Sequence, residues 1–219
     1  MDRYMARTPG AREEANKCIG MKRWGGSPLL MVLDVGFTSV GLGYFSSVVP
    51  AVQRFGSWGQ ITTLRELQDT DVESLRLFWK NRRSWQVASS AASYLVRLQE
   101  EREMPSELDA LACWARESRA ANWKDDTVGR IRGVGMGTFQ YLRMNGGVDT
   151  VMPDKIVRRV VGRIFRDAGR ELEADGDLSL IETVKDLGQA TGYRSLDICW
   201  MCWLLSVASP SGEEVDAVP

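Results

Sequence analysis

The sequence contains no histidine among its 219 residues. Without an imidazole, the chain has no Ser-His-Asp triad, no Cys-His pair and no histidine ligand for a metal ion. Any acid–base chemistry must therefore be carried out by Asp, Glu, Lys, Tyr or Cys side chains.

Cysteine is scarce, with four residues: Cys18, Cys113, Cys199 and Cys202. Cys199 and Cys202 form a C-x-x-C motif, but they lie in an apolar stretch that predicts a buried helix. No second close pair accompanies them, so a four-ligand zinc or iron–sulfur site is poorly supported. We interpret them as core residues and expect neither a metal nor a cofactor. Free thiols also fit a reducing intracellular compartment, the cytoplasm with its nucleoid or the nucleus.

Long apolar runs are missing as well. No run reaches the roughly 18 residues that a membrane span needs, and the first 24 residues are too polar for a signal peptide. We therefore expect no membrane partner. Apolar residues still make up 44% of the chain, which is enough for a core. The composition predicts a flexible segment over 1–24, one domain over 25–208 and a polar tail over 209–219.

The alternating pattern of β-strands is also absent, whereas helical periodicity recurs along the chain. The sequence thus predicts an all-α fold. We expect helices over 28–35, 40–55, 63–67, 85–101, 125–130, 137–144, 154–168, 178–187 and 196–207, with a break at 36–39. Two further helices are expected, one capped by Asp71 and one that begins at Pro105-Ser106.

Residues 131–138 read Ile-Arg-Gly-Val-Gly-Met-Gly-Thr, a glycine turn that opens into a helix. Free backbone N–H groups at a helix N-terminus suit a phosphate group. An ordinary helix–helix turn is the alternative, although one glycine usually suffices for it. Between positions 123 and 170 the chain carries ten basic and five acidic residues, an excess of five positive charges. This excess favours a surface that binds a nucleic-acid backbone.

Asp154 follows Gly133 by 21 positions, comes directly after Pro153 and begins a predicted helix rich in arginine. A carboxylate in this position caps a helix and stabilises it by about 1 kcal/mol. The same carboxylate can act on a sugar whose phosphate the glycine turn holds. The two roles are compatible.

These motifs resemble the helix-hairpin-helix superfamily of DNA glycosylases, which includes endonuclease III, the adenine glycosylases and the alkylpurine glycosylases. The resemblance extends over residues 27–207 and implies two intertwined helical lobes with a DNA-binding cleft. It implies that Asp154 is catalytic, in preference to Asp149 of the similar Val148-Asp149-Thr150 segment. The DNA-binding residues that it implies are Gly133, Gly135, Gly137, Thr138, Arg132, Lys155 and Arg158.

The chain departs from the family pattern in three places. Gly137 occupies the position of the lysine that forms a Schiff base in bifunctional members, so the resemblance implies no lyase activity. The four-cysteine iron–sulfur loop is missing. Gly36-Phe37-Thr38-Ser39 replaces the Gln-x-Thr segment, whose glutamine fills the gap left by a flipped base.

Phe37, Thr38 and Tyr44 are candidate base-pocket residues, although both aromatic rings also suit a protein core. The resulting hypothesis is a monomeric, monofunctional DNA glycosylase of base excision repair. Its partner is duplex DNA that contains a damaged or mismatched base. A non-catalytic helix-hairpin-helix DNA-binding protein is the alternative, and an unrelated helical regulator is the third.

Overall fold

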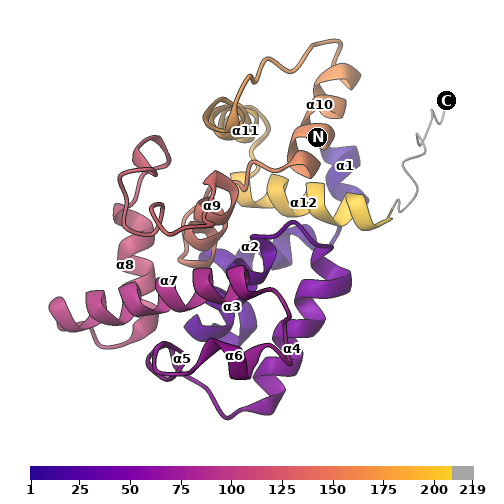
Figure 1. The fold of residues 1–219 in the computed structure, drawn as a ribbon. Coiled ribbons are helices and arrows are strands. Elements are labelled where there is room, and N and C mark those ends of the chain that lie inside the picture. The colour runs from indigo at the N-terminus through magenta and orange to yellow at the C-terminus, as the bar shows by residue number, and fades with distance from the viewer. Residues whose placement is uncertain (209–219) are drawn as a thin grey trace.

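The computed structural model describes residues 1–208, and every regular element in that range is helical (Figure 1). The predicted all-α class is confirmed. The elements are α1 (Asp2–Ala6), α2 (Ala11–Ile19), η1 (Arg23–Gly26), α3 (Pro28–Thr38), η2 (Tyr44–Val48), α4 (Val49–Trp58), α5 (Leu64–Gln68), α6 (Val72–Leu75), α7 (Arg82–Glu101), α8 (Glu107–Glu117), η3 (Ala120–Asn122), α9 (Met136–Asn145), α10 (Lys155–Asp167), α11 (Asp177–Thr191) and α12 (Ser195–Ala208). The predicted polar tail lies outside the described residues. None of the helices up to residue 208 is long and apolar enough to cross a membrane.

Two helices organise the core. The long α7 packs against α3, α5 and α8, and its Trp85 is fully buried. On the other side of the molecule, α12 packs against α2, α10 and α11 (Figure 1). Most side chains of α12 are buried, because neighbouring helices cover it on several sides.

The segment 1–24, expected to be flexible, instead contains α1, α2 and the start of η1. Ala11, Ala15 and Cys18 are fully buried on α2, which packs against α12. Their spacing of four and three residues places them on one helix face. The segment is therefore packed into the core, and the prediction of flexibility was wrong. The stripe of small residues is hard to recognise in the sequence because charged residues surround it.

The break expected at 36–39 lies at 39–43, because α3 continues through Gly36. A Cβ at Gly36 would lie 3.0 Å from the Ala88 Cβ and 3.0 Å from the Ser84 backbone oxygen on α7. Glycine therefore lets α3 approach α7 closely, and its role is packing and not helix termination.

The helix expected over 125–130 is a series of turns. The Asp126 Oδ1 accepts a hydrogen bond from the Val128 amide at 2.8 Å, a local contact that competes with helix formation. A Cβ at Gly129 would lie only 1.6 Å from the Trp123 backbone oxygen, so the turn also requires glycine there.

Two glycine-to-alanine substitutions should change stability in opposite directions. Gly36→Ala should lower the free energy of unfolding by about 1–3 kcal/mol, because α3 and α7 must separate. Gly162→Ala is the control within α10, where the new Cβ would meet only the Leu172 Cδ2 at 3.7 Å. It should raise the free energy of unfolding by about 0.5–1 kcal/mol. Urea denaturation followed by circular dichroism measures both, and equal effects would contradict the packing role of Gly36.

Candidate functional site

The glycine turn leads into α9 as a tight connection. Gly133 has φ +107°, a backbone conformation that favours glycine, and the Val134 amide donates to the Ile131 oxygen at 2.9 Å. Gly135 is the N-cap of α9, and no side chain caps this helix. The first amides of α9 therefore remain available to an outside acceptor.

Gly133 also lies directly against α7. A Cβ there would lie 2.8 Å from the Arg83 Nε and 3.0 Å from the Val87 Cγ2. The exposed Arg83 thus adds a positive charge beside the turn, and Arg132 adds another from the turn itself. The contact with Arg83 joins positions 50 residues apart, and the sequence pattern did not reveal it.

The remaining residues of the turn differ in accessibility. A Cβ at Gly135 would meet no atom within 4 Å, so this glycine faces open space. At Gly137 it would lie 3.3 Å from the Met152 Cε. The Thr138 side chain is buried, so only its backbone amide, in the first turn of α9, remains as a donor.

Asp154 is the N-cap of α10, as its position after Pro153 predicts. Its Oδ1 accepts from the Val157 amide at 2.7 Å, and its Oδ2 accepts from the Trp203 Nε1 at 2.9 Å. Burial raises the pKa of this carboxyl above its usual value, while the hydrogen bonds from Val157 and Trp203 act in the opposite direction. Asp154 is thus a half-buried carboxylate held in one orientation.

The segment before Asp154 is tied to α9. The Asp154 amide donates to the Met152 oxygen at 2.8 Å, and the Met152 Cε lies only 3.3 Å from the position that a Cβ at Gly137, in the first turn of α9, would take. The Gln140 Nε2 donates to the Thr150 Oγ1 at 2.8 Å. These contacts bring the glycine turn and Asp154 to the same part of the molecule.

Asp149, the other candidate carboxylate, serves a different element. Its side chain is exposed, and its Oδ1 accepts from the Leu196 amide at 2.9 Å at the start of α12. It therefore anchors α12.

The three basic residues nearest the start of α10 differ in their contacts. Lys155 and Arg159 are exposed, and neither makes an ion pair within residues 1–208. Arg158 donates to the Ala174 oxygen and lies 3.9 Å from the Asp177 carboxylate. Its guanidinium is therefore engaged by α11 and by the loop that precedes α11. Of the two α10 residues expected to contact DNA, Lys155 is free and Arg158 is engaged.

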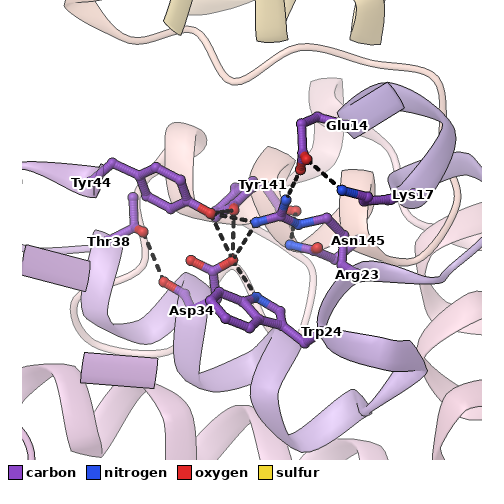
Figure 2. Close-up of polar contacts among 9 residues, drawn as sticks. All are labelled: Glu14, Lys17, Arg23, Trp24, Asp34, Thr38, Tyr44, Tyr141 and Asn145. Atoms are coloured by element: carbon purple, nitrogen blue, oxygen red, sulfur yellow. Dashed lines mark hydrogen bonds and ion pairs between the residues drawn. The ribbon is translucent and has the colours of Figure 1, made fainter. Parts of the chain in front are cut away.

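A buried polar cluster surrounds Asp34, and of its members that bind the Asp34 carboxylate only Tyr44 belongs to the site predicted from the sequence (Figure 2). Asp34 is fully buried, and its Oδ2 accepts from four side chains. The donors and distances are the Arg23 guanidinium at 3.3 Å, the Trp24 indole at 2.8 Å, the Tyr44 hydroxyl at 3.1 Å and the Tyr141 hydroxyl at 2.7 Å. The Oδ1 has no partner among the described residues.

Charge in this cluster is balanced by pairing. Burial raises the pKa of the Asp34 carboxyl, and the adjacent Arg23 guanidinium lowers it. Arg23 also pairs with Glu14, which in turn binds Lys17 at 2.7 Å (Figure 2). A buried carboxylate without such partners would be strongly destabilising.

The cluster also holds an unusual backbone. Trp24 has φ +52°, which is costly for a residue with a side chain. The hydrogen bond from its indole to Asp34 and the Arg23 guanidinium over its ring, 5.5 Å from the centroid, hold it there.

A surface cavity of about 380 Å³ adjoins this cluster. Its walls are aromatic and basic, with one carboxylate and one amide. The lining residues are Glu14, Lys17, Lys22, Arg23, Trp24, Gly25, Tyr44, Phe45, Val49, Gln53 and Trp200. Its volume falls within the range of pockets that hold small organic groups.

Trp203 connects the cavity wall to Asp154. Its ring centroid lies 5.8 Å from that of Tyr44 and 5.4 Å from that of Tyr141, and its indole donates to Asp154. Trp203 belongs to the apolar stretch that predicts a buried helix, and that pattern gives no sign of its hydrogen bond to Asp154.

Of the three base-pocket candidates, only Tyr44 lines the cavity. Phe37 is fully buried, stacked on Trp79 at 4.8 Å and edge-on to Trp85 at 4.9 Å, so its assignment to a pocket was wrong. The Thr38 hydroxyl donates to the Asp34 backbone oxygen at 2.8 Å, so this hydroxyl is already engaged within α3.

Cys199 and Cys202 are fully buried on α12, as predicted, and burial raises the pKa of both thiols. No group of three or more His, Cys, Asp or Glu side chains in the described part of the chain could hold a metal ion.

One sequence signal could have revealed the buried cluster. Asp34 is the only charged residue in the apolar run from position 28 to 37. A lone carboxylate in such a run requires partners elsewhere in the fold.

No protein-family model, no curated protein and no solved structure matches this chain.

Breaking the buried pair should cost far more stability than breaking an exposed one. Arg23→Met should lower the free energy of unfolding by about 3–5 kcal/mol, because the buried Asp34 loses its cation. Arg65→Met is the control: Arg65 pairs with Glu100 at 2.6 Å, but both side chains are more than half exposed. It should have little effect on the free energy of unfolding, because water and salt screen an exposed ion pair. Urea denaturation at pH 7 compares them, and similar costs would argue against the importance of the buried pair.

Proposed function

We propose that this chain is a DNA N-glycosylase that releases a damaged or mismatched base and does not cleave the strand. The observation that carries the proposal is the close approach of the Met152 side chain to Gly137, in the first turn of α9. This approach puts the segment that ends at Asp154 beside the helix that follows the glycine turn, and so supports a site shared by the turn and the half-buried carboxylate of Asp154. Two helical lobes with duplex DNA between them, and action as a monomer, belong to the same proposal.

The turn at Gly133–Gly135 would hold the DNA backbone. Its uncapped amides point their partial positive charge outward, and a phosphate oxygen is a suitable acceptor. Arg83, Arg132, Lys155 and Arg159 supply exposed positive charge on the turn and on the elements beside it. Such contacts fix the register of the protein on DNA without reading its sequence.

Asp154 would act on the sugar. Breaking an N-glycosidic bond builds positive charge on the deoxyribose, and a carboxylate beside C1′ stabilises that charge. The same carboxylate can orient or deprotonate the attacking water. Trp203 and the Val157 amide hold it in place for either task.

The cavity beside Tyr44 would receive the extruded base. Trp24, Tyr44 and Trp200 provide aromatic surface for stacking, and Arg23 provides hydrogen-bond donors close by. Tyr44 and Trp203 link this cavity to Asp154.

The absence of an amine at Gly137 supports hydrolysis without strand cleavage. A lyase reaction needs a nucleophilic amine that forms a Schiff base with the sugar, and glycine has none.

A non-catalytic DNA-binding protein is the second candidate, and one observation favours it. Both carboxylate oxygens of Asp154 already accept a hydrogen bond, one in the helix cap and one from Trp203. Such a carboxylate suits a purely structural role, although each oxygen keeps a second lone pair.

DNA binding should depend on the open glycine of the turn. Gly135→Leu should fold normally, because its Cβ meets no atom within 4 Å, but its side chain would block an approaching phosphate. We expect the affinity for any duplex to fall about tenfold or more, as for the loss of one or two charged hydrogen bonds. Fluorescence anisotropy at several salt concentrations measures this, and wild-type affinity should decline as salt rises.

Gly176→Leu is the matched control, since Gly176 is the N-cap of α11 and its Cβ is equally unobstructed. It should bind DNA like the wild type. Equal affinity of both variants, or binding that ignores salt, would contradict the assignment of the turn.

Asp154→Asn should separate catalysis from capping. Asn still accepts the Val157 amide but carries no charge, so base release should fall about a hundredfold or more while duplex binding is kept. The assay is a panel of duplexes with one lesion or mismatch each, treated with hot alkali to reveal abasic sites. Because burial raises the pKa of Asp154, wild-type base release should decline on acidification at a higher pH than the protonation of a fully solvated aspartate would predict.

Asp149→Asn is the control, because Asp149 anchors α12 and takes no part in the proposed reaction. It should release the base normally. A wild-type protein that is inactive on the whole panel but binds DNA would support the second candidate. Strong borohydride trapping of a protein–DNA adduct would show that an amine elsewhere in the protein attacks the sugar, and it would contradict the proposed lack of strand cleavage.

A further inference from the structure

The exposed start of α10 carries two positive charges that form no ion pair within residues 1–208, those of Lys155 and Arg159. The two residues lie four positions apart, which places them on one face of the helix. Burial raises the pKa of Asp154, and the Arg159 guanidinium acts in the opposite direction, so its charge lies near that carboxylate. We call Lys155 and Arg159 the basic face of α10, and this face borders the proposed site.

Helix α12 ends beside the basic face. Trp203 of α12 donates its indole N–H to the Asp154 Oδ2 at 2.9 Å. Val207, which is 48% exposed, follows on the same side of α12, about 6 Å further along the helix axis. The helix ends at Ala208, so the chain leaves α12 about one and a half turns beyond its contact with Asp154.

The sequence that follows α12 has the opposite charge. Residues 209–219 contain three carboxylates, those of Glu213, Glu214 and Asp216, and neither lysine nor arginine. An extended chain advances about 3.5 Å per residue, so Glu213 can reach to about 17 Å from Ala208. The basic face lies within this reach, because α12 ends beside it.

We propose that the segment 209–219 binds the basic face of α10 when no DNA is present, and that its carboxylates compete there with the phosphates of DNA. The inference rests on the proposed function, which makes DNA the competitor. The occupant is the chain's own segment, because a short connection holds the three carboxylates near Lys155 at an effective concentration of roughly millimolar.

The competition is weak and reversible. Exposed ion pairs are individually weak, because water and salt screen them. The segment therefore does not exclude DNA, but a duplex has to displace it before phosphates can contact Lys155 and Arg159. It lowers the affinity for every duplex by a similar factor, and this reduces the fraction of the protein held on intact DNA.

The first test needs no DNA. A carbodiimide joins a carboxylate to a lysine amine that it contacts, and mass spectrometry of the digested full chain identifies the pair. At low salt we expect Lys155 to be joined to Glu213 or Glu214 within single copies, with a yield that falls as salt rises. An excess of duplex should abolish this crosslink. Lys185 is the internal control, because its Nζ lies 3.2 Å from the Glu182 Oε2 and should be joined to it with or without DNA.

The second test measures DNA binding by fluorescence anisotropy. The variant Glu213→Gln, Glu214→Gln, Asp216→Asn should bind any duplex about three- to tenfold more tightly than the wild type at low salt. The gain should disappear at about 0.5 M salt, where exposed charges are screened.

The matched control removes three negative charges elsewhere. The variant Asp69→Asn, Glu103→Gln, Asp186→Asn changes exposed carboxylates at the end of α5, after α7 and on α11. It has the same net charge as the first variant, and its affinity for DNA should stay within about twofold of the wild type.

The two tests separate the proposals. If no duplex binds but Lys155 is joined to the segment, the proposed function fails, while the crosslink still supports the docking of the segment. A missing Lys155 crosslink, or one that joins only two different copies, overturns the docking. If DNA binds, an unchanged affinity of the segment variant, or an equal gain by the control variant, overturns the competition and leaves the proposed function intact.

Discussion

The buried carboxylate of Asp34 is the constraint on which the surroundings of the site depend. Its Oδ2 accepts hydrogen bonds from η1, η2 and α9, and the Arg23 that pairs with it is tied to α2 through Glu14. A charge without access to water is tolerated only where such donors surround it. Because Tyr44 and Tyr141 are two of these donors, and both rings pack on Trp203, the cluster also determines the position of the group that orients Asp154.

Helix α7 supports the other half of the site. Gly36 of α3 and Gly133 of the turn both lie in close contact with its first turns, where a Cβ would collide. The distance between α3 and the glycine turn is therefore set by α7, because the backbone of each lies directly against this one helix. Met152 then connects the turn to Asp154. The arrangement is built from packed helices and short connections, which is how functional groups are held with small positional error.

Local sequence patterns predicted most helices but few of their partners. The apolar stripe of α7 and the Pro153-Asp154 start of α10 are local signals, and both corresponded to elements of the structure. The bond between Asp34 and Tyr141 joins residues 107 positions apart, and no local pattern encodes it. Phe37 illustrates the same limit of local patterns. Periodicity places its ring on an apolar helix face, but it does not indicate whether that ring packs against Trp79 or lines a cavity. A glycine such as Gly36 is typical of a helix break, but in this fold it lets α3 contact α7. Only the position of α7 determines which of these two roles the glycine has.

The packing of α2 against α12 has a consequence for how the chain folds. Residues 11–19 and residues 195–208 lie at opposite ends of the described sequence, yet they share one core. Contacts of such large sequence separation require the closure of a long loop and form slowly. During synthesis, α2 lacks its main packing partner until α12 has left the ribosome, although α9 and η1, which it also contacts, emerge earlier. The core around α12 can therefore assemble only as a late step, after the helices on either side of α7 have had time to pack.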